Sequence, residues 1–595
     1  MSRHLKRYLG AFLTCSSLVL SGCNVKDREG TSQSFSSGRQ PDKMPLAQRS
    51  VINRADASSG IRSMPSQGDV NILVVPVKVK GVDNYFQWEY RDSRMDGLVG
   101  FGEGEPWEIS FTDKEDLPQS RGFYVDSWMD MIEKAFFGEP EETGFESVSS
   151  YYYKSSYGKL NISGAVGPEY ETALSYSQIL EEIERDPEGY KGVTDQILED
   201  IYYDFFVKRK IYSVDQFDGD RDGVIDAIWM IYDCPSYEMD YRIDPDLMWA
   251  YTTWYGDGSY WPGEKDNHLS VYGWASKWFM MDGIYAQIPY LDQEGNLLPD
   301  SHTYIHETGH IMGLNDYYDT SSGPYTRSPT ASLIMMDHNV YDQDVYSKYL
   351  LGWVNPKQYW SRDLYSSETL TLRPFESSGD CVVLNLPYND GWVGEEYLIL
   401  CYWTPAGLNE TDALNPYQGA TESSIYYSGL DEPGIMMFHV DSRFLTYTYD
   451  FYWEATAVAS EGDLLSAEDN SMTEAYQLAY SNDTGTTRLE AEEDDVQLEM
   501  IDASNRFDHM KQKTSSQWGG TVNSPLQETA DNDFLFHEGD VYDSSYLGDK
   551  GNFYVSFHGE DAVMGGSNDY SLRLGIRVDF GKQTEDGAII TLSQE

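Results

Sequence analysis

Cysteine is scarce in this chain, with five residues among 595. One lies in the apolar stretch at the start and another is Cys23; the remaining three are Cys234, Cys381 and Cys401. Three cysteines permit at most one internal disulfide, and their spacing matches no zinc ribbon. We expect either buried, reduced thiols or one disulfide with a spare thiol.

Basic residues are also few, with 42 Lys and Arg against 99 Asp and Glu and a formal net charge of −57. This balance argues against a nucleic-acid partner, because a protein that binds phosphates must neutralise them with Lys and Arg. An acidic surface of this kind fits an exported, calcium-loaded protein. After the first residues no apolar run is long enough to span a membrane, and no internal repeat is visible.

The N-terminus has the pattern of an export signal. Basic residues precede an apolar run from Tyr8 to Leu20, and Leu20-Ser-Gly-Cys23 has the form of a lipobox. The alternative is an ordinary signal peptide cleaved near a chance cysteine. We predict that residues 1–23 are a lipoprotein signal peptide and that Cys23 is lipidated. The mature chain would then be an extracytoplasmic, cell-envelope lipoprotein whose lipid is its sole membrane contact, and shedding from the envelope stays open.

Residues 24–66 are rich in Ser, Gly, Arg, Lys and Asp and show little hydrophobic periodicity. This composition is typical of a flexible tether. A short pro-segment is the alternative interpretation.

The segment from Ser301 to Asp319 contains His306, Glu307 and His310 in an H-E-x-x-H arrangement. On a helix, residues four apart share a face, so both imidazoles can point at one metal ion. Glu307 lies about 100° round the helix from His306, beside the ion, where its carboxylate can take a proton from a zinc-bound water. A chance match on a surface helix is the alternative.

Two further residues complete the pattern H-E-x-x-H-x-x-G-x-x-D. Gly313 can adopt a left-handed conformation that ends the helix and turns the chain back. Asp316 can then supply an oxygen as the third ligand, since a catalytic zinc site normally has three protein ligands. Four of the ten histidines (302, 306, 310 and 338) fall in this region, which favours a site over chance.

At these residues the chain resembles the metzincin clan of zinc peptidases, and within it the immune inhibitor A family. The matching motifs are H-E-T-G-H-I-M-G-L-N-D-Y-Y-D, S-L-I-M-M-D-H-N and, from Tyr346 to Pro356, Y-S-K-Y-L-L-G-W-V-N-P. The resemblance covers scattered motifs from Val70 to Asp441. It implies a methionine turn beneath the zinc, at Met335 or Met336, and Ile334-Met335 favours Met335. Asp337 stands where some metzincins have a tyrosine, which leaves the oxyanion donor open.

A second constellation runs from Asp215 to Asp226. Asp218, Asp220 and Asp222 alternate, Gly223 permits a sharp turn and Asp226 returns a carboxylate, with the carbonyl of Val224 as a further ligand. This layout predicts a structural Ca²⁺ site, because carboxylates this close repel one another without a cation. Trp229 replaces the glutamate of an EF-hand, and the immune inhibitor A family has a similar loop. The alternative is an acidic turn.

The resemblance implies an α/β (α+β) metzincin-like catalytic domain over residues 67–356, with a twisted mixed sheet and an active-site helix. Residues 357–595 show short alternating runs that predict one or two all-β, sandwich-like domains. Expected strands begin with Asp69–Val79 and Ala227–Tyr232 and continue with 369–373, 381–386, 396–400, 434–440, 552–557 and 571–578; expected helices are Phe123–Phe137, Ser175–Arg185 and Thr194–Val207.

Other chemistry-bearing residues have plainer interpretations. Trp249–Trp278 reads as a Trp/Tyr/Gly-rich loop that either lines a substrate cleft or packs. Asp319 and Asp337 could orient metal ligands, although an exposed loop carboxylate is the preferred interpretation of each. His439 is interpreted as a packed strand histidine rather than a ligand.

Together these features predict an exported, lipid-anchored zinc endopeptidase with one catalytic Zn²⁺, a structural Ca²⁺ and Glu307 as general base. Its partner would be a protein or peptide substrate, and we expect a monomer. Two alternatives stay open. One is a surface binding or adhesion protein that keeps the zinc fold, and the other is a zinc hydrolase acting on cell-wall material.

Overall fold

The structure is a computed structural model of the chain. It describes residues 47–48, 63–82, 90–91, 98–99, 106–110, 120–124, 127–185, 190–234, 247–255, 268–281, 292, 297–317, 325–327, 330–331, 333–414, 430–442, 444–448, 455–458, 473–477, 497–504, 510–514, 521–522, 532–544, 546 and 574–595. The chain divides into two compact units. Among the described residues, the second unit contains residues 155–157 and the residues from Asn315 onward, so the main boundary falls after Leu314. This boundary precedes Pro356, where the sequence pattern changes.

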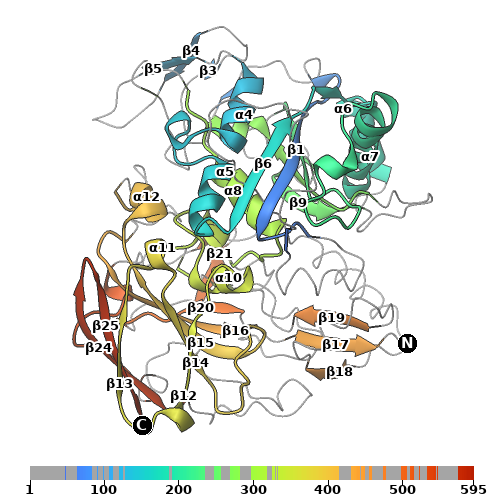
Figure 1. The fold of residues 1–595 in the computed structure, drawn as a ribbon. Helices are drawn as coiled ribbons and strands as arrows, with labels where there is room; N and C mark the ends of the chain where they lie inside the picture. Colours follow the sequence, from blue (N-terminus) through green and yellow to red (C-terminus); the bar gives the residue numbers. More distant parts are fainter. Residues whose placement is uncertain are drawn as a thin grey trace. The chain divides into compact units, whose positions relative to one another are not determined.

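The first unit is built on a mixed sheet with strand order β6-β1-β8-β10-β9, with β7 beside β1 (Figure 1). Strands β1, β6, β8 and β10 are parallel and β9 is antiparallel to β10. The strands of this sheet are β1 (Gly68–Lys78), β6 (Leu160–Val166), β7 (Tyr170–Glu171), β8 (Ile228–Tyr232), β9 (Tyr251–Trp254) and β10 (Val271–Ser276). The short pairs are β2 (Tyr90–Arg91) with β3 (Leu98–Val99) and β4 (Pro106–Ser110) with β5 (Ser120–Tyr124).

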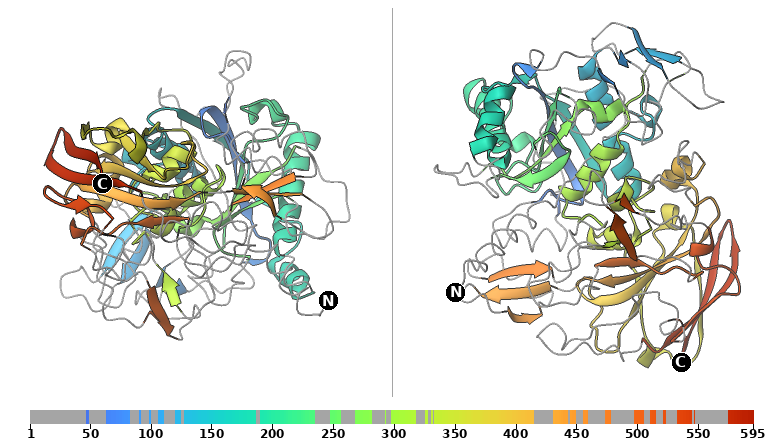
Figure 2. Two further views of the ribbon diagram at one scale, coloured as in Figure 1. Left: turned by 90° about the horizontal axis from the view of Figure 1, so that it is seen from below. Right: turned by 180° about the vertical axis from the view of Figure 1, so that it is seen from behind.

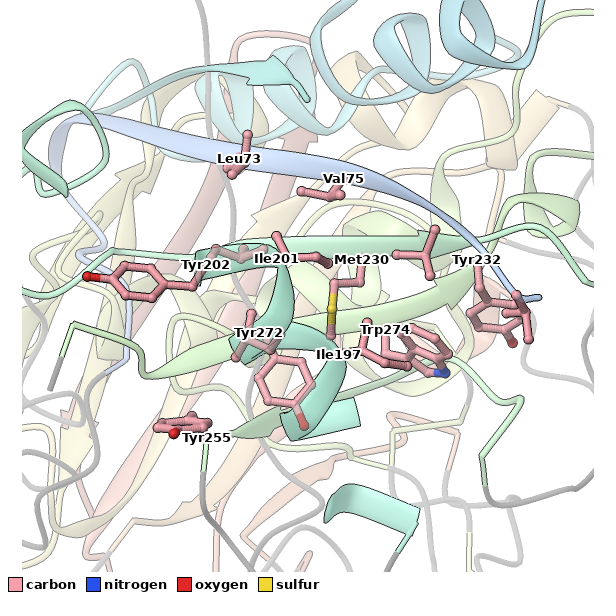
Figure 3. Close-up of a cluster of buried hydrophobic side chains, with 14 of the residues drawn as sticks. Leu73, Val75, Ile197, Ile201, Tyr202, Met230, Tyr232, Tyr255, Tyr272 and Trp274 are labelled. Carbon is pink, nitrogen blue, oxygen red and sulfur yellow. The ribbon is translucent and has the colours of Figure 1, made fainter. Parts of the chain in front are cut away.

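Helices flank this sheet. They are α4 (Trp128–Phe137), α5 (Val148–Ser155), α6 (Tyr176–Arg185), α7 (Tyr190–Tyr202) and α8 (His302–His310), and α7 continues into a π-helical segment, η3 (Tyr203–Lys208). Alternate residues of β1, such as Leu73 and Val75, pack against α6 and α7 in one apolar core. Figure 3 shows this core, with Ile197 and Ile201 of α7 beside Met230 of β8.

Aromatic contacts fix α4 and α8 on the sheet. The ring of Trp229 on β8 lies 5.4 Å from that of Phe136 on α4 and 6.0 Å from that of Tyr304 on α8. Gly273 on β10 makes room for the indole, because a Cβ there would lie 2.5 Å from the Trp229 ring. The site-bearing helix is therefore packed against the central strands of the sheet.

The second unit contains two larger sheets, with orders β12-β14-β15-β16-β20 and β13-β25-β24-β23. Both sheets contribute to a single apolar core, as expected for a sandwich. In Figure 2 the red hairpin β24–β25 runs beside the yellow strands of the other sheet. The strands are β12 (Lys357–Trp360), β13 (Glu368–Leu372), β14 (Cys381–Asn385), β15 (Glu396–Trp403), β16 (Gly434–Asp441), β20 (Leu498–Met500), β23 (Val541–Tyr542), β24 (Ile576–Thr584) and β25 (Gly587–Gln594).

Smaller elements complete this unit. Two more sheets are formed by β11 (Tyr325–Arg327), β21 (Met510–Thr514) and β22 (Thr521–Val522), and by β17 (Phe444–Thr448), β18 (Ala455–Val458) and β19 (Thr473–Gln477). The helices are α9 (Met335–His338), α10 (Val345–Leu350), α11 (Phe375–Ser378) and α12 (Glu410–Leu414). The chain thus has the mixed α and β character that the sequence predicted.

Most predicted elements that fall on described residues are confirmed, including β1, β8, β13 to β16, α6 and α7. Two predictions are wrong. The helix expected from Phe123 starts at Trp128, because Phe123 and Tyr124 pair in the β4–β5 hairpin. The loop expected at Trp249–Trp278 contains β9 and β10, whose residues are all buried.

The predicted signal peptide, Cys23 and the strand at 552–557 lie outside the described residues, as does most of the predicted tether. Among the helices that the structure describes, none has the length and apolar character needed to cross a membrane.

Candidate metal centre

Helix α8 is held in place by hydrogen bonds between hydroxyl and carbonyl groups that link it to three neighbouring elements, β10, α5 and β9. The Tyr304 hydroxyl donates to the carbonyl of Ser276 on β10 at 2.6 Å. In the opposite direction, Tyr152 on α5 donates to the Ile305 carbonyl at 2.8 Å, and Thr252 on β9 donates to the Glu307 carbonyl at 3.1 Å. Each bond satisfies a buried polar group, so sliding or rotating the helix would break several bonds at once.

This helix brings the two predicted imidazole ligands together. The Nε2 atoms of His306 and His310 are 3.1 Å apart, and the rings meet nearly edge to face at 84°. Both residues are buried. Two nitrogens bound to one tetrahedral zinc ion at about 2.05 Å lie roughly 3.3 Å apart, so this spacing fits a shared ion.

The tautomer of His310 is fixed by a hydrogen bond on the side of the ring away from His306. Its Nδ1 lies 2.8 Å from the carbonyl oxygen of Leu314, which can only accept, so Nδ1 carries the proton. The Nε2 of the neutral ring is then a lone-pair donor that faces His306. The bond to Leu314 exists because the chain turns back: Gly313 has φ 110°, and the N–H of Leu314 donates to the Gly309 carbonyl at 3.2 Å. The predicted left-handed glycine is confirmed.

Glu307 completes a buried group with the two histidines. One of its carboxylate oxygens lies within 4.8 Å of a ring nitrogen of each histidine, so these three residues could hold a metal ion. The carboxylate Oε2 also accepts from the hydroxyl of Thr252 at 3.3 Å. Thr252 therefore contacts both the backbone and the side chain of Glu307, and it limits where the carboxylate can point.

The structure places Asp316 and Met335 in the second unit, where both are buried. Within this unit the N–H of Tyr317 donates to the Met336 carbonyl at 2.8 Å, so the segment that carries Asp316 is tied to the methionine segment. The methionines begin the single-turn helix α9, which ends at left-handed Asn339 with φ 58°. Asp316 is not part of the His306, Glu307 and His310 group found within 4.8 Å.

The neighbouring histidine and aspartates have structural roles. His302 is buried with its Nδ1 2.7 Å from Asp300, and its ring stacks on Phe145 at 4.1 Å between centroids. Asp337 is buried and accepts from the hydroxyl of Thr330, so the expectation of an exposed carboxylate is wrong for it. Asp319 lies outside the described residues.

In the second unit His439 is buried on β16 beside Glu396, as expected of a packed strand histidine.

The acidic loop of the first unit forms a second group. Asp218, Asp220 and Asp222 each offer an oxygen within 4.8 Å of the others, so this loop too could hold a cation. Its shape is set by left-handed Arg221 and Gly223, with φ 63° and 87°. The loop lies directly before the central strand β8, so the order of this loop bears on the sheet that supports α8.

Backbone donors hold the carboxylates of this loop in place. Asp218 accepts from the N–H groups of Asp222 and Gly223 at 3.0 and 2.9 Å, and Asp226 accepts from Gly219 at 2.7 Å. The pKa of the Asp218 carboxyl is raised, chiefly because the group is buried and also because Asp222 is charged. The backbone N–H donors oppose this rise. A bound cation would remove the like-charge repulsion. Asp226 is buried outside the close group, and its carboxylate closes the loop through the bond from Gly219.

Sequence reasoning missed Thr252, Tyr152 and the Leu314 carbonyl. Thr252 lies in the stretch interpreted as loop, although Tyr-Thr-Thr-Trp is a strand-forming sequence that could have identified β9. No side-chain pattern identifies a backbone carbonyl as the partner of His310.

No protein-family profile matches this chain, and no curated protein matches it.

If the two imidazoles share one ion, His310→Ala should reduce bound zinc from about one ion per chain to a small fraction, because two ligands from the helix are needed. Zinc is measured by mass spectrometry after dialysis, with circular dichroism as a check of folding. The matched control is His537→Ala, a second-unit histidine that bonds a backbone carbonyl. Equal zinc in His310→Ala and the control would contradict the shared ion.

If the acidic loop binds Ca²⁺, calcium at about 100 times its Kd should stabilise the first unit by about 2.7 kcal/mol. Asp220→Asn should remove most of this gain, because it deletes a charge from the close group. Asp215→Asn is the matched control, since Asp215 is exposed and outside that group. Urea unfolding with calcium and with a chelator measures the difference, and no calcium effect on the parent chain would exclude the site.

Proposed function

We propose that the chain is an exported, lipid-anchored zinc endopeptidase. The observation that carries the proposal is the buried His306 and His310 pair, with Nε2 atoms 3.1 Å apart and the Glu307 carboxylate beside them. A surface helix with a chance match has no reason to bury two adjacent imidazoles next to a carboxylate. The motif resemblance to the immune inhibitor A family points to the same activity.

His306 and His310 would hold zinc through Nε2, and Asp316 would be the third ligand. Left-handed Gly313 between His310 and Asp316 is the turn that this ligand pattern calls for, which supports the assignment. The donor set of two neutral imidazoles and a carboxylate suits zinc. When bound, zinc polarises a substrate carbonyl and lowers the pKa of a coordinated water to about 7.

Glu307 would serve as the general base. Its carboxylate accepts the proton of the attacking water and then delivers it to the leaving amine, so that one residue acts in both halves of the reaction. Thr252 keeps this carboxylate turned toward the two histidines by its hydrogen bond at 3.3 Å. The Leu314 carbonyl holds His310 in the tautomer that leaves Nε2 without a proton.

Replacing the base tests the reaction. Glu307→Gln should lower casein or gelatin cleavage by about 10²- to 10⁴-fold, the usual contribution of a general base, while zinc remains bound. Exposed Glu141→Gln in the same unit is the matched control. Near-normal cleavage by Glu307→Gln would sink the mechanism, and a parent chain that binds zinc but cleaves nothing would favour a surface binding protein.

Replacing Thr252 tests the orientation of that base. Thr252→Val keeps the shape of the side chain and deletes its hydroxyl, so kcat should fall about tenfold with little change in KM or zinc content. Thr253→Val is the matched control on the same strand, because its buried hydroxyl makes no hydrogen bond within the described residues. Equal kcat values for the two variants would contradict the orienting role.

A further inference from the structure

Two buried thiols lie opposite each other in the second unit. Cys381 is the first residue of β14, Cys401 is on antiparallel β15, and the two are directly paired in the register of the strands. The exposed fractions of their side chains are 3% and 2%. Both are free thiols. The remaining described cysteine, Cys234, is in the first unit, with its Sγ 3.4 Å from the sulfur of Met248.

The register places these thiols within disulfide range. Directly opposed residues of an antiparallel pair have Cα atoms about 4.5 or 5.5 Å apart, depending on the hydrogen-bond position. Disulfides bridge Cα atoms about 4.4–6.8 Å apart, so either position is compatible with a bond. Opposed side chains also point to the same face of the sheet. The flanking residues Val382 and Leu400 belong to the sandwich core, so both thiols point to the other face.

On that other face lies a buried lysine. Lys348 of α10 is fully buried, with Nζ 4.5 Å from the centre of the Tyr157 ring and 5.1 Å from that of Phe375. Burial raises the pKa of the Cys381 thiol to about 12 and that of Cys401 well above its usual value, although the Lys348 charge lowers both. The thiolate is the reactive form, so these thiols are slow to oxidise once the second unit is folded. A disulfide between them must therefore form while the second unit is folding.

We propose that Cys381 and Cys401 close a disulfide that fastens β14 to β15 when the chain folds in an oxidising compartment, while Cys234 stays a thiol. This bond is independent of the proposed peptidase activity. It would link two strands that contribute residues to the sandwich core. The bond would stabilise the second unit mainly by restricting the unfolded chain between the two cysteines.

The oxidant is a small-molecule or protein disulfide. The thiolate of one cysteine attacks this disulfide and forms a mixed disulfide, and one thiolate leaves the oxidant. The thiolate of the other cysteine then attacks the protein sulfur of the mixed disulfide and expels the second thiolate. In sum, two thiol protons and two electrons leave the protein, one S–S bond forms and the oxidant disulfide becomes two thiols.

Refolding the chain from about residue 24 in oxidised glutathione tests this pairing. The product is denatured, alkylated without reduction, digested and analysed by mass spectrometry. We expect alkylation at Cys234 alone and one linked peptide pair joining Cys381 to Cys401, which reduction separates. Alkylation at all three cysteines, or a link to Cys234, would overturn the proposal. This readout uses the unaltered chain, so it does not depend on a variant that folds.

Stability gives a second readout. The oxidised protein should melt roughly 5–10 °C above the reduced protein in the transition of the second unit. Cys401→Ala should abolish this difference between oxidised and reduced samples, and Cys234→Ala should keep it. Equal melting of the oxidised and reduced parent chain would show that the bond does not fasten the strands. Alkylation of the folded, reduced parent should also be slow, because both thiols are buried.

Discussion

The candidate metal centre depends on one constraint, the fixed position and rotation of helix α8. Hydroxyl groups from α5 and β9 bond its carbonyls, its own Tyr304 bonds β10, and aromatic rings press it against the central strand β8. The α-helical repeat then places His306 and His310 on one face. A helix that could rotate freely would carry both imidazoles together, and it would break the hydrogen bond from Thr252 that orients the Glu307 carboxylate.

The parts of the site that obey local rules could be predicted from the sequence. The histidine pair follows from their spacing, and the left-handed Gly313 follows from the need to end the helix. The acidic loop was found in the same way, because its alternating aspartates and Gly223 lie within a few residues of one another. In each case the residues that form the site are neighbours in one segment of the sequence.

Features that depend on distant segments could not be predicted. The hydroxyl of Thr252 reaches Glu307 only because the fold brings β9 to α8. The aromatic-rich sequence around Thr252 was interpreted as a loop, so β9 was not predicted. Cys381 and Cys401 are paired by the register of β14 on β15, which the intervening residues do not reveal. Likewise the compact units part after Leu314, whereas the hydrophobic pattern changes later.

The proposed zinc site has His306, His310 and Asp316 as its ligands. X-ray absorption spectroscopy of the zinc-loaded protein tests this ligand set most directly, because imidazole, oxygen and sulfur ligands give distinct signals. We expect two imidazole nitrogens at about 2.0–2.1 Å with oxygen in the remaining positions. Scattering from sulfur at about 2.3 Å, or from a single imidazole, would contradict it.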